Sequence, residues 1–147
     1  MTKLLSIPFV IAAVSGITMA IQGTLNSVLG QKTSLLAATL IVHIIGTLIA
    51  VLAVLLTRVP IFQHNWLSVP WHLYLGGVLS VIIVGLVAVS IPKIGVCNAT
   101  TAIIIGQVGA AIIIDHFGWL GVERLPWNPW QFLGLALFAA GAKLLFR

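Results

Sequence analysis

The amino-acid sequence predicts an all-α integral membrane protein with five transmembrane helices, and three observations lead to this fold class. The chain has 147 residues, of which 61% are hydrophobic and only 6% are charged, whereas a soluble domain carries about 25% charged residues. Its mean hydropathy is +1.22. Its apolar residues fall into long runs separated by short polar or proline-containing segments, and about 20 apolar residues are enough for one helix to cross a bilayer. We therefore expect a single five-helix transmembrane domain over residues 1–147.

The first span is predicted over residues 4–29. No Lys, Arg, Asp or Glu occurs between Leu4 and Gln31, so this stretch can cross a bilayer without placing a charge inside it. Pro8 lies in the opening turns, where a helix can do without a backbone N–H. Lys3 before an apolar run is also typical of a signal peptide, but the apolar region of a signal peptide has only about 7–15 residues. We expect an uncleaved transmembrane helix.

The second and third spans are bounded by residues that interrupt helices. The second is predicted over residues 35–57 and ends before Arg58 and Pro60. The third is predicted over residues 71–91, because residues 92–95 combine a proline, a charge and a glycine. Such a cluster usually ends a helix.

The fourth and fifth spans complete the predicted domain. The fourth is predicted over residues 98–114 with Asn98 as its N-cap, since an asparagine side chain can accept a hydrogen bond from the first turn. A loop is expected over residues 115–129, and the fifth span over residues 130–145. An odd number of spans places the two ends of the domain on opposite sides of the membrane.

A stripe of polar residues runs along the first span, at Ser15, Thr18, Gln22 and Asn26. Spacings of three and four place these residues on one face of a helix. Facing lipid, each would lose water without compensation, at a cost of a few kcal/mol. We therefore expect the stripe to line a substrate cavity, with Gln22 and Asn26 as the main contacts because amides both donate and accept hydrogen bonds. The alternative is that these residues bridge helices, each contributing roughly 0.6 kcal/mol.

A second stripe follows the predicted second span, at Thr39, His43 and Thr47. His43 is the one ionisable residue well inside a predicted span, and such residues are candidates for function. Histidine changes charge between about pH 5 and 8, so His43 could couple transport to protons. A neutral imidazole bonded to a neighbouring hydroxyl is an equally simple interpretation, and both stay open.

The fourth span carries two further candidates for substrate binding, Thr100 and Gln107. They are seven residues apart and share one helical face, while Gly106 and Gly109 permit a neighbouring helix to approach closely. We expect Gln107 to face the same cavity as Gln22.

The end of the fourth span carries a possible gate. Asp115 lies at its C-terminal end, where the helix dipole disfavours a negative charge. An ion pair with His116 or Arg124 would offset that cost. This ion pair is either a gate at the membrane interface or an ordinary contact of the loop.

The cationic residues are divided almost evenly between the two sides that this topology defines. One side carries Lys3, Arg58 and Arg124. The other side carries Lys32, Lys93, Lys143 and Arg147. Cytoplasmic loops normally hold an excess of Lys and Arg, so two interpretations stay open. The protein either inserts in one orientation despite a weak bias, or inserts in both orientations, which is dual topology.

Several other classes of function are excluded by composition and motifs. The net charge is +5, but the cations are spread singly along the chain, so no nucleic-acid partner is expected. There is no Cys/His cluster with metal spacing, no phosphate-binding glycine loop and no paired carboxylates. We therefore expect neither an enzyme nor a metal or cofactor. The single Cys97 excludes a disulfide within the chain.

Six short segments stand out for their order and spacing along the chain. They are Gln22-Gly23-Thr24-Leu25-Asn26, Gly46-Thr47, Leu75-Gly76-Gly77, Pro92-Lys93-Ile94-Gly95, Gly106-Gln107 and Asp115-His116-Phe117-Gly118. Together they resemble the half-length, five-helix YdcZ-like family of the drug/metabolite transporter superfamily, over nearly the whole chain. The resemblance also singles out Gln22 and Asn26. His43 departs from it, since an aromatic residue is expected there.

The resemblance implies a bacterial inner-membrane protein whose full-length relatives have ten helices, built as two inverted five-helix repeats. A five-helix chain would then pair antiparallel with a second copy, or with a sister chain, as a 5+5 inverted-repeat dimer. Its remaining partners would be membrane lipid and a small-molecule substrate.

These observations predict a small secondary transporter that works by alternating access within such a dimer. No carboxylate lies inside a predicted span, so a strongly cationic substrate would find no buried counter-charge. A small neutral, polar or weakly anionic metabolite or drug is therefore expected. Two alternatives stay open: a dual-topology channel for a small ion, and a structural subunit that transports nothing without a sister chain.

Overall fold

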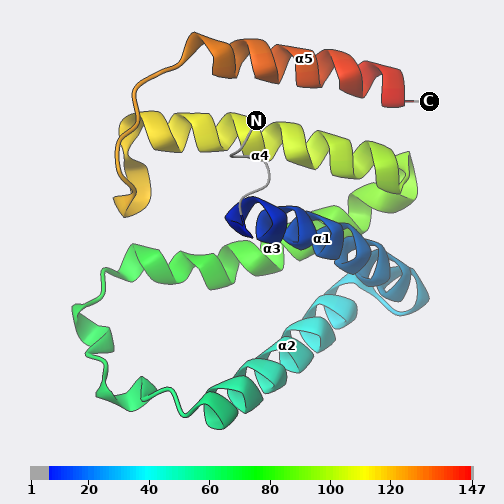
Figure 1. Cartoon of the computed structure of the whole chain (residues 1–147). Coiled ribbons are helices and arrows are strands. Elements are labelled where there is room, and N and C mark those ends of the chain that lie inside the picture. The colour runs from blue at the N-terminus through cyan, green and yellow to red at the C-terminus, as the bar shows by residue number, and fades with distance from the viewer. Residues whose placement is uncertain (1–6, 147) are drawn as a thin grey trace. The chain divides into compact units, whose positions relative to one another are not determined.

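The computed structural model describes residues 7–146, and over that range the chain is helical and contains no strand. The predicted all-α fold class is thereby confirmed. Five α-helices follow one another along the chain (Figure 1): α1 (Ile7–Lys32), α2 (Leu35–Thr57), α3 (Leu75–Ile94), α4 (Val96–Phe117) and α5 (Pro129–Leu145). Residues 4–6 of the first predicted span lie outside the described residues.

Among the described residues, four helical segments are long and apolar enough to cross a membrane. They are α1, α2, α4 and the segment Trp71–Ile94, in which the 3-10 helix η4 (Trp71–Tyr74) leads into α3. The fifth helix, α5, is also apolar but has only 17 residues. At 1.5 Å per residue it is about 25 Å long, somewhat less than the hydrocarbon core of about 30 Å. The five predicted spans thus correspond to four full-length helices and one short one.

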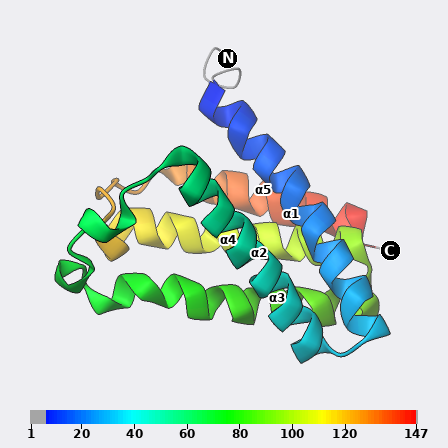
Figure 2. The same ribbon diagram turned by 90° about the horizontal axis from the view of Figure 1, so that it is seen from below.

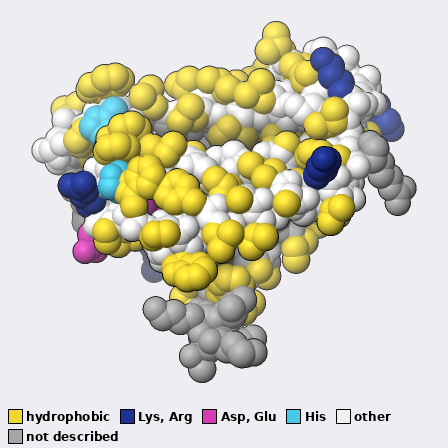
Figure 3. All heavy atoms as spheres, turned by 90° about the horizontal axis from the view of Figure 1, so that it is seen from above, with side chains coloured by type: hydrophobic (Ala, Val, Ile, Leu, Met, Phe, Trp, Pro, Cys, Tyr) yellow, Lys and Arg dark blue, Asp and Glu magenta, His cyan; other side chains and the backbone are white. Residues whose placement is uncertain are grey.

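Large hydrophobic side chains are exposed along all five helices, as at Ile11, Leu48, Leu86, Ile113 and Leu137. On the face shown in Figure 3, hydrophobic side chains are spread widely and Lys and Arg side chains are scattered among them. Soluble proteins seldom expose apolar surface on this scale. In a bilayer the same side chains would contact lipid tails, as the fold class requires.

The chain divides into two compact units, one that ends at Pro92 and one that begins at Lys93. The first unit holds α1, α2 and nearly all of α3. The second holds the end of α3 together with α4 and α5.

A short turn joins α1 to α2 in the first unit. Ser34 is the N-cap of α2, and its hydroxyl accepts a hydrogen bond from Ala37 N at 3.2 Å. Close to the turn the helices are in contact, since a Cβ added to Gly30 would lie 3.9 Å from Ala38 Cβ. From there α1 and α2 diverge (Figure 1), and α2 crosses α3 (Figure 2).

Small residues allow α1 to cross α3 closely. A Cβ added to Gly23 would lie 2.9 Å from Val87 Cγ1, a separation that side chains do not tolerate. One turn further along α1, Ser27 is only 1% exposed and its hydroxyl donates a hydrogen bond to Ala88 O at 3.4 Å. Helices in membranes pack in this way, through small residues and single polar contacts.

The contact of Ser27 with Ala88 explains why α3 continues through a proline. Pro92 has no N–H, and in an α-helix that N–H would donate to the carbonyl four residues earlier, which is Ala88 O. Ser27 supplies the missing donor from α1. Serine side chains in membrane proteins commonly satisfy carbonyls that a proline leaves free. The prediction that the third helix ends at residue 91 is therefore wrong, because α3 extends to Ile94.

We expect Ser27→Ala to destabilise the protein by about 1 kcal/mol, because it leaves the buried Ala88 carbonyl without a donor. In a Pro92→Ala background the restored N–H can bond to Ala88 O, so the same substitution should cost close to nothing. Unfolding free energies in a detergent titration measure this double-mutant cycle. Ser90→Ala is the control, since Ser90 bonds to Leu86 O of its own helix. If Ser27→Ala lowers the free energy of unfolding equally in both backgrounds, the Ser27 hydroxyl does not replace the N–H that Pro92 lacks.

The junction between α3 and α4 consists of one residue. Gly95 has a φ of +82° and serves as the N-cap of α4, which begins at Val96. Such a φ strongly favours glycine, which is why the two helices can follow one another directly. Asn98 therefore lies in the first turn of α4, and its predicted role as the N-cap is wrong.

In the second unit α4 and α5 lie side by side and run antiparallel (Figure 1). The start of α5 is fixed by a capping box. Asn128 Oδ1 accepts from Trp130 N at 3.0 Å, Gln131 Oε1 accepts from Asn128 N at 3.3 Å, and Pro129 is the first helical residue. The capping box ends the loop between the two helices, so α5 turns back along α4.

Candidate functional site

A polar hollow of about 330 Å³ lies in the first unit, and all of its lining residues belong to helices rather than loops. All three helices of that unit contribute to it. Its lining residues are Gln22 from α1, Val42, His43, Gly46, Thr47 and Ala50 from α2, and Ser80 and Val84 from α3. Gln22 belongs to the predicted stripe of the first span, and His43 and Thr47 belong to that of the second, and the fold brings these three residues to one hollow.

Both ring nitrogens of His43 have hydrogen-bond partners, one within α2 and the other on α3. Nδ1 lies 2.7 Å from Thr39 O, and Nε2 lies 2.9 Å from Ser80 Oγ. A carbonyl oxygen can only accept, so Nδ1 carries the proton. In the neutral ring Nε2 is then an acceptor, and the Ser80 hydroxyl donates to it.

Ser80 is a functional candidate that sequence reasoning missed. It is the lone hydroxyl in the apolar run between Gly77 and Ser90, so it forms no stripe of its own. Only its position opposite His43 reveals it. In the alternative of a neutral histidine bonded to a neighbouring hydroxyl, that hydroxyl is Ser80 Oγ.

The threonines of the stripes present acceptor oxygens. The hydroxyls of Thr18, Thr39 and Thr47 donate to Val14 O, Leu35 O and His43 O, one turn earlier on their own helices, at 2.8–2.9 Å. With its proton engaged, the Thr47 hydroxyl can offer the hollow an acceptor. Thr18 is exposed on α1 and is not among the residues that line the hollow.

Gln22 and Asn26 differ in their surroundings, although they belong to one stripe. Gln22 is exposed and lines the hollow. Asn26 is only 6% exposed and lies beside Ser27, on the part of α1 that packs against other helices. The structure therefore places Gln22, but not Asn26, with His43 and Ser80.

The candidates of the fourth predicted span lie in the second unit. Thr100 is half-buried and Gln107 is exposed on α4. Thr101, one residue further, is buried and contributes to an apolar hollow of about 760 Å³ between α4 and α5. The prediction that Gln107 shares a cavity with Gln22 stays a prediction.

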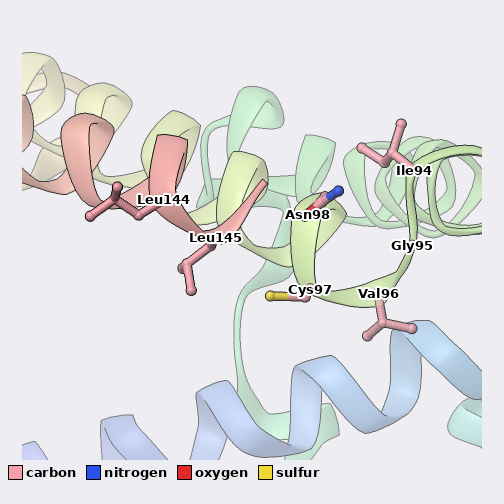
Figure 4. Close-up of a pocket in the computed structure, with 7 residues that line it drawn as sticks. All are labelled: Ile94, Gly95, Val96, Cys97, Asn98, Leu144 and Leu145. Carbon is pink, nitrogen blue, oxygen red and sulfur yellow. The ribbon is translucent and has the colours of Figure 1, made fainter. Parts of the chain in front are cut away.

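Another hollow, of about 600 Å³, lies at the start of α4 and the end of α5 (Figure 4). Asn98 is its polar side chain, and Cys97, Leu144 and Leu145 are among its neighbours. Among its lining residues the Cys97 thiol is the ionisable group. This hollow therefore offers a ligand fewer hydrogen-bonding side chains than the polar hollow of the first unit.

The end of α4 is held by Arg124 from the following loop. Gly118 ends α4 with a φ of +63°, and the chain returns so that Arg124 Nε donates to His116 O at 3.0 Å. Leu125 N donates to Asp115 O at 2.8 Å. A guanidinium beside the last carbonyls of a helix is favourable for the helix dipole.

This contact differs from the predicted ion pair, because Arg124 bonds to a backbone carbonyl rather than to the Asp115 carboxylate. The His116 ring lies edge-on to the Phe117 and Trp127 rings, with centroid distances of 4.9 and 4.5 Å. An ion pair of Asp115 stays a prediction. The three proposed gate residues do lie together at one end of α4.

Within residues 7–146 no group of three or more His, Cys, Asp or Glu side chains is placed to hold a metal ion. The polar hollow of the first unit offers an amide, an imidazole and two hydroxyls without a permanent charge. This set can bind a small polar molecule by hydrogen bonds.

Comparison with known families agrees with an all-helical membrane protein. The family model described as "Putative inner membrane exporter, YdcZ" matches residues 7–144, which is nearly the whole chain. No curated protein and no solved structure matches. A family of exporters, together with several membrane-spanning helices, indicates transport across the inner membrane. The chain belongs to the YdcZ inner-membrane exporter family and is a multi-pass membrane protein.

Proposed function

We propose that the protein is a small secondary transporter for a small neutral, polar or weakly anionic molecule, which binds in the polar hollow of the first unit. The observation that carries this proposal is that Gln22, His43, Thr47 and Ser80 line one hollow within helices that can cross a membrane. Polar groups at this depth are costly unless they serve a function or meet partners. A volume of about 330 Å³ is at the lower end of the range for small-molecule sites.

We further propose that two chains pair antiparallel and that alternating access occurs between them. Ser15, Thr18 and Gln22 are exposed on α1, where contact with lipid would be unfavourable. A second chain would cover them. The near-equal division of cationic residues between the two sides supports insertion in both orientations, which an inverted pair of identical chains needs.

In this proposal the remaining polar residues have subsidiary roles. Asn26 supports helix packing beside the hollow, while Thr100 and Gln107 of α4 extend the substrate path. Asp115, His116 and Arg124 form the gate at the end of α4. Their clustering at one helix end supports this assignment.

We expect Gly46→Leu to abolish ligand binding while the protein still folds. Gly46 lines the hollow, and a Cβ added there meets nothing within 4 Å, so a leucine side chain can occupy the space that the ligand needs. The measurement is the melting temperature of the purified protein with propionate, benzoate, benzamide, glucose or glycine added. A ligand of the native state raises that temperature.

Gly16→Leu is the matched control, because Gly16 also has open space around its Cβ position but does not line the hollow. It should keep the ligand-induced shift. A compound that stabilises wild type and Gly46→Leu equally would place binding elsewhere. In proteoliposomes, saturable flux with counterflow supports the carrier, whereas conductance that does not saturate would identify a channel.

A further inference from the structure

We infer that the polar hollow binds a small monocarboxylate together with one proton, and that the proton resides on Nε2 of His43. This inference rests on the proposed function, whose substrate class it makes specific. It follows from the charges around His43, from the direction of its hydrogen bonds and from the lining of the hollow.

The first unit offers a protonated His43 no counter-charge. Residues 1–92 contain no Asp or Glu. From α1 the hollow receives Gln22, and from α3 it receives Ser80 and Val84, none of which is charged. The cations Lys32 and Arg58 lie at helix ends. A charge within a span is costly without a partner nearby, and a carboxylate ligand would bring the opposite charge that the first unit lacks.

The hydrogen bonds of His43 decide where the added proton goes. Nδ1 already donates to Thr39 O, so a second proton from the surrounding water can bind only at Nε2. The Nε2–H group then donates to Ser80 Oγ, which lies 2.9 Å away. This reverses the bond found with the neutral ring and frees the Ser80 O–H to donate elsewhere.

Protonation therefore changes the hollow from an acceptor site to a donor site. The freed Ser80 hydroxyl and the Gln22 amide N–H groups are then available to the two oxygens of a carboxylate. The imidazolium supplies the positive charge beside them. With a neutral His43 the Ser80 proton is engaged, so a carboxylate would meet one donor fewer and no opposite charge.

The size and lining of the hollow limit the acid that fits. Val42, Ala50 and Val84 also line the hollow, and their apolar side chains suit a short alkyl or aryl tail. One histidine can balance only one negative charge, and burying a second without a partner is costly. A monocarboxylate is therefore favoured over a dicarboxylate, and the bound proton and anion cross the membrane as a neutral pair.

Proton uptake on binding tests the inference directly. Wild-type protein is titrated by calorimetry with propionate and benzoate, and with the neutral propionamide and benzamide, in two buffers of different ionisation enthalpy. We expect one proton taken up per bound carboxylate and none per amide. Affinity for the carboxylates should fall as the pH rises, by up to about tenfold per pH unit, because one proton is linked to binding.

His43→Gln should abolish the proton uptake, and His64→Gln and His72→Gln are the matched controls that keep it. His64 follows the 3-10 helix η2 (Ile61–Gln63) and His72 lies in η4 at the start of the third span, and neither is among the residues that line the hollow. Carboxylate binding without proton uptake, uptake that survives in His43→Gln, or no carboxylate binding at pH 5.5 would each overturn the inference.

The same data separate this inference from the proposed function. If amides bind as well as carboxylates in a manner that Gly46→Leu abolishes, the transport site stands and the proton-linked acid is wrong. If carboxylates bind with one proton but proteoliposomes show no carboxylate flux, the binding chemistry stands and the transporter proposal is wrong.

Discussion

Replacing Gln22 with alanine is expected to lower ligand affinity about five- to 150-fold, since a bound ligand would cover the Gln22 amide and loss of one partner of a covered hydrogen bond costs about 1–3 kcal/mol. Gln22 is the only side chain that α1 contributes to the lining of the polar hollow, and its amide supplies both a donor and acceptors. Flux at low substrate concentration should fall by a similar factor. Binding calorimetry and proteoliposome uptake, with the compound that gives the largest thermal shift, measure the two effects.

The fold should tolerate this substitution. Gln22 is exposed on α1, so the melting temperature and the amount of the proposed dimer should stay close to wild type. Gln63→Ala, at an exposed glutamine of the loop helix η2, is the control that should keep full affinity. Loss of the folded dimer in Gln22→Ala would instead support a role in bridging helices.

The helices of this protein could be predicted because long apolar runs allow few other structures. Their ends were harder to predict. Pro92 predicts the end of a helix, but α3 continues because Ser27, which is distant in sequence and close in space, donates to Ala88 O. Asn98 has the side chain that usually forms an N-cap, whereas Gly95 takes that position because its backbone adopts a positive φ. Local propensity identifies candidates for these positions but does not rank them.

The candidate site was predictable where the residues repeat with helical spacing. The stripes of α1 and α2 identified Gln22 and His43, because polar residues on one face of an apolar helix are conspicuous. Ser80 escaped, because a single serine in an apolar helix has no periodicity. Asn26 belongs to the same stripe as Gln22 but is buried by helix packing. One face of a helix contacts different neighbours along its length, so helical spacing alone does not show which residues of a stripe are buried.

Fixing the orientation of every chain is expected to abolish transport without damaging the fold. Gln31→Lys with Thr33→Lys adds two positive charges beside Lys32, which would hold the turn between α1 and α2 in the cytoplasm. Gln63→Lys with Asn65→Lys adds two to the loop that carries Arg58, which would hold the opposite side there. All four positions are exposed, so packing should be little affected.

Each oriented variant should be inserted and stable, because only the direction of insertion changes. Chains of a single orientation cannot form an inverted pair, so each variant alone should show background flux. The accessibility of Lys-reactive labels from each side of the membrane verifies the orientation. Gln31→Ala with Thr33→Ala is the control for effects of the altered turn, and it should retain transport.

The most direct test of the antiparallel pair is the flux of the two oriented variants expressed together. We expect transport to recover well above that of either variant alone, since each supplies the orientation that the other lacks. Substrate uptake into vesicles with matched amounts of inserted protein measures this recovery. Full activity of one oriented variant by itself would contradict the account, because the functional unit would then be parallel or monomeric.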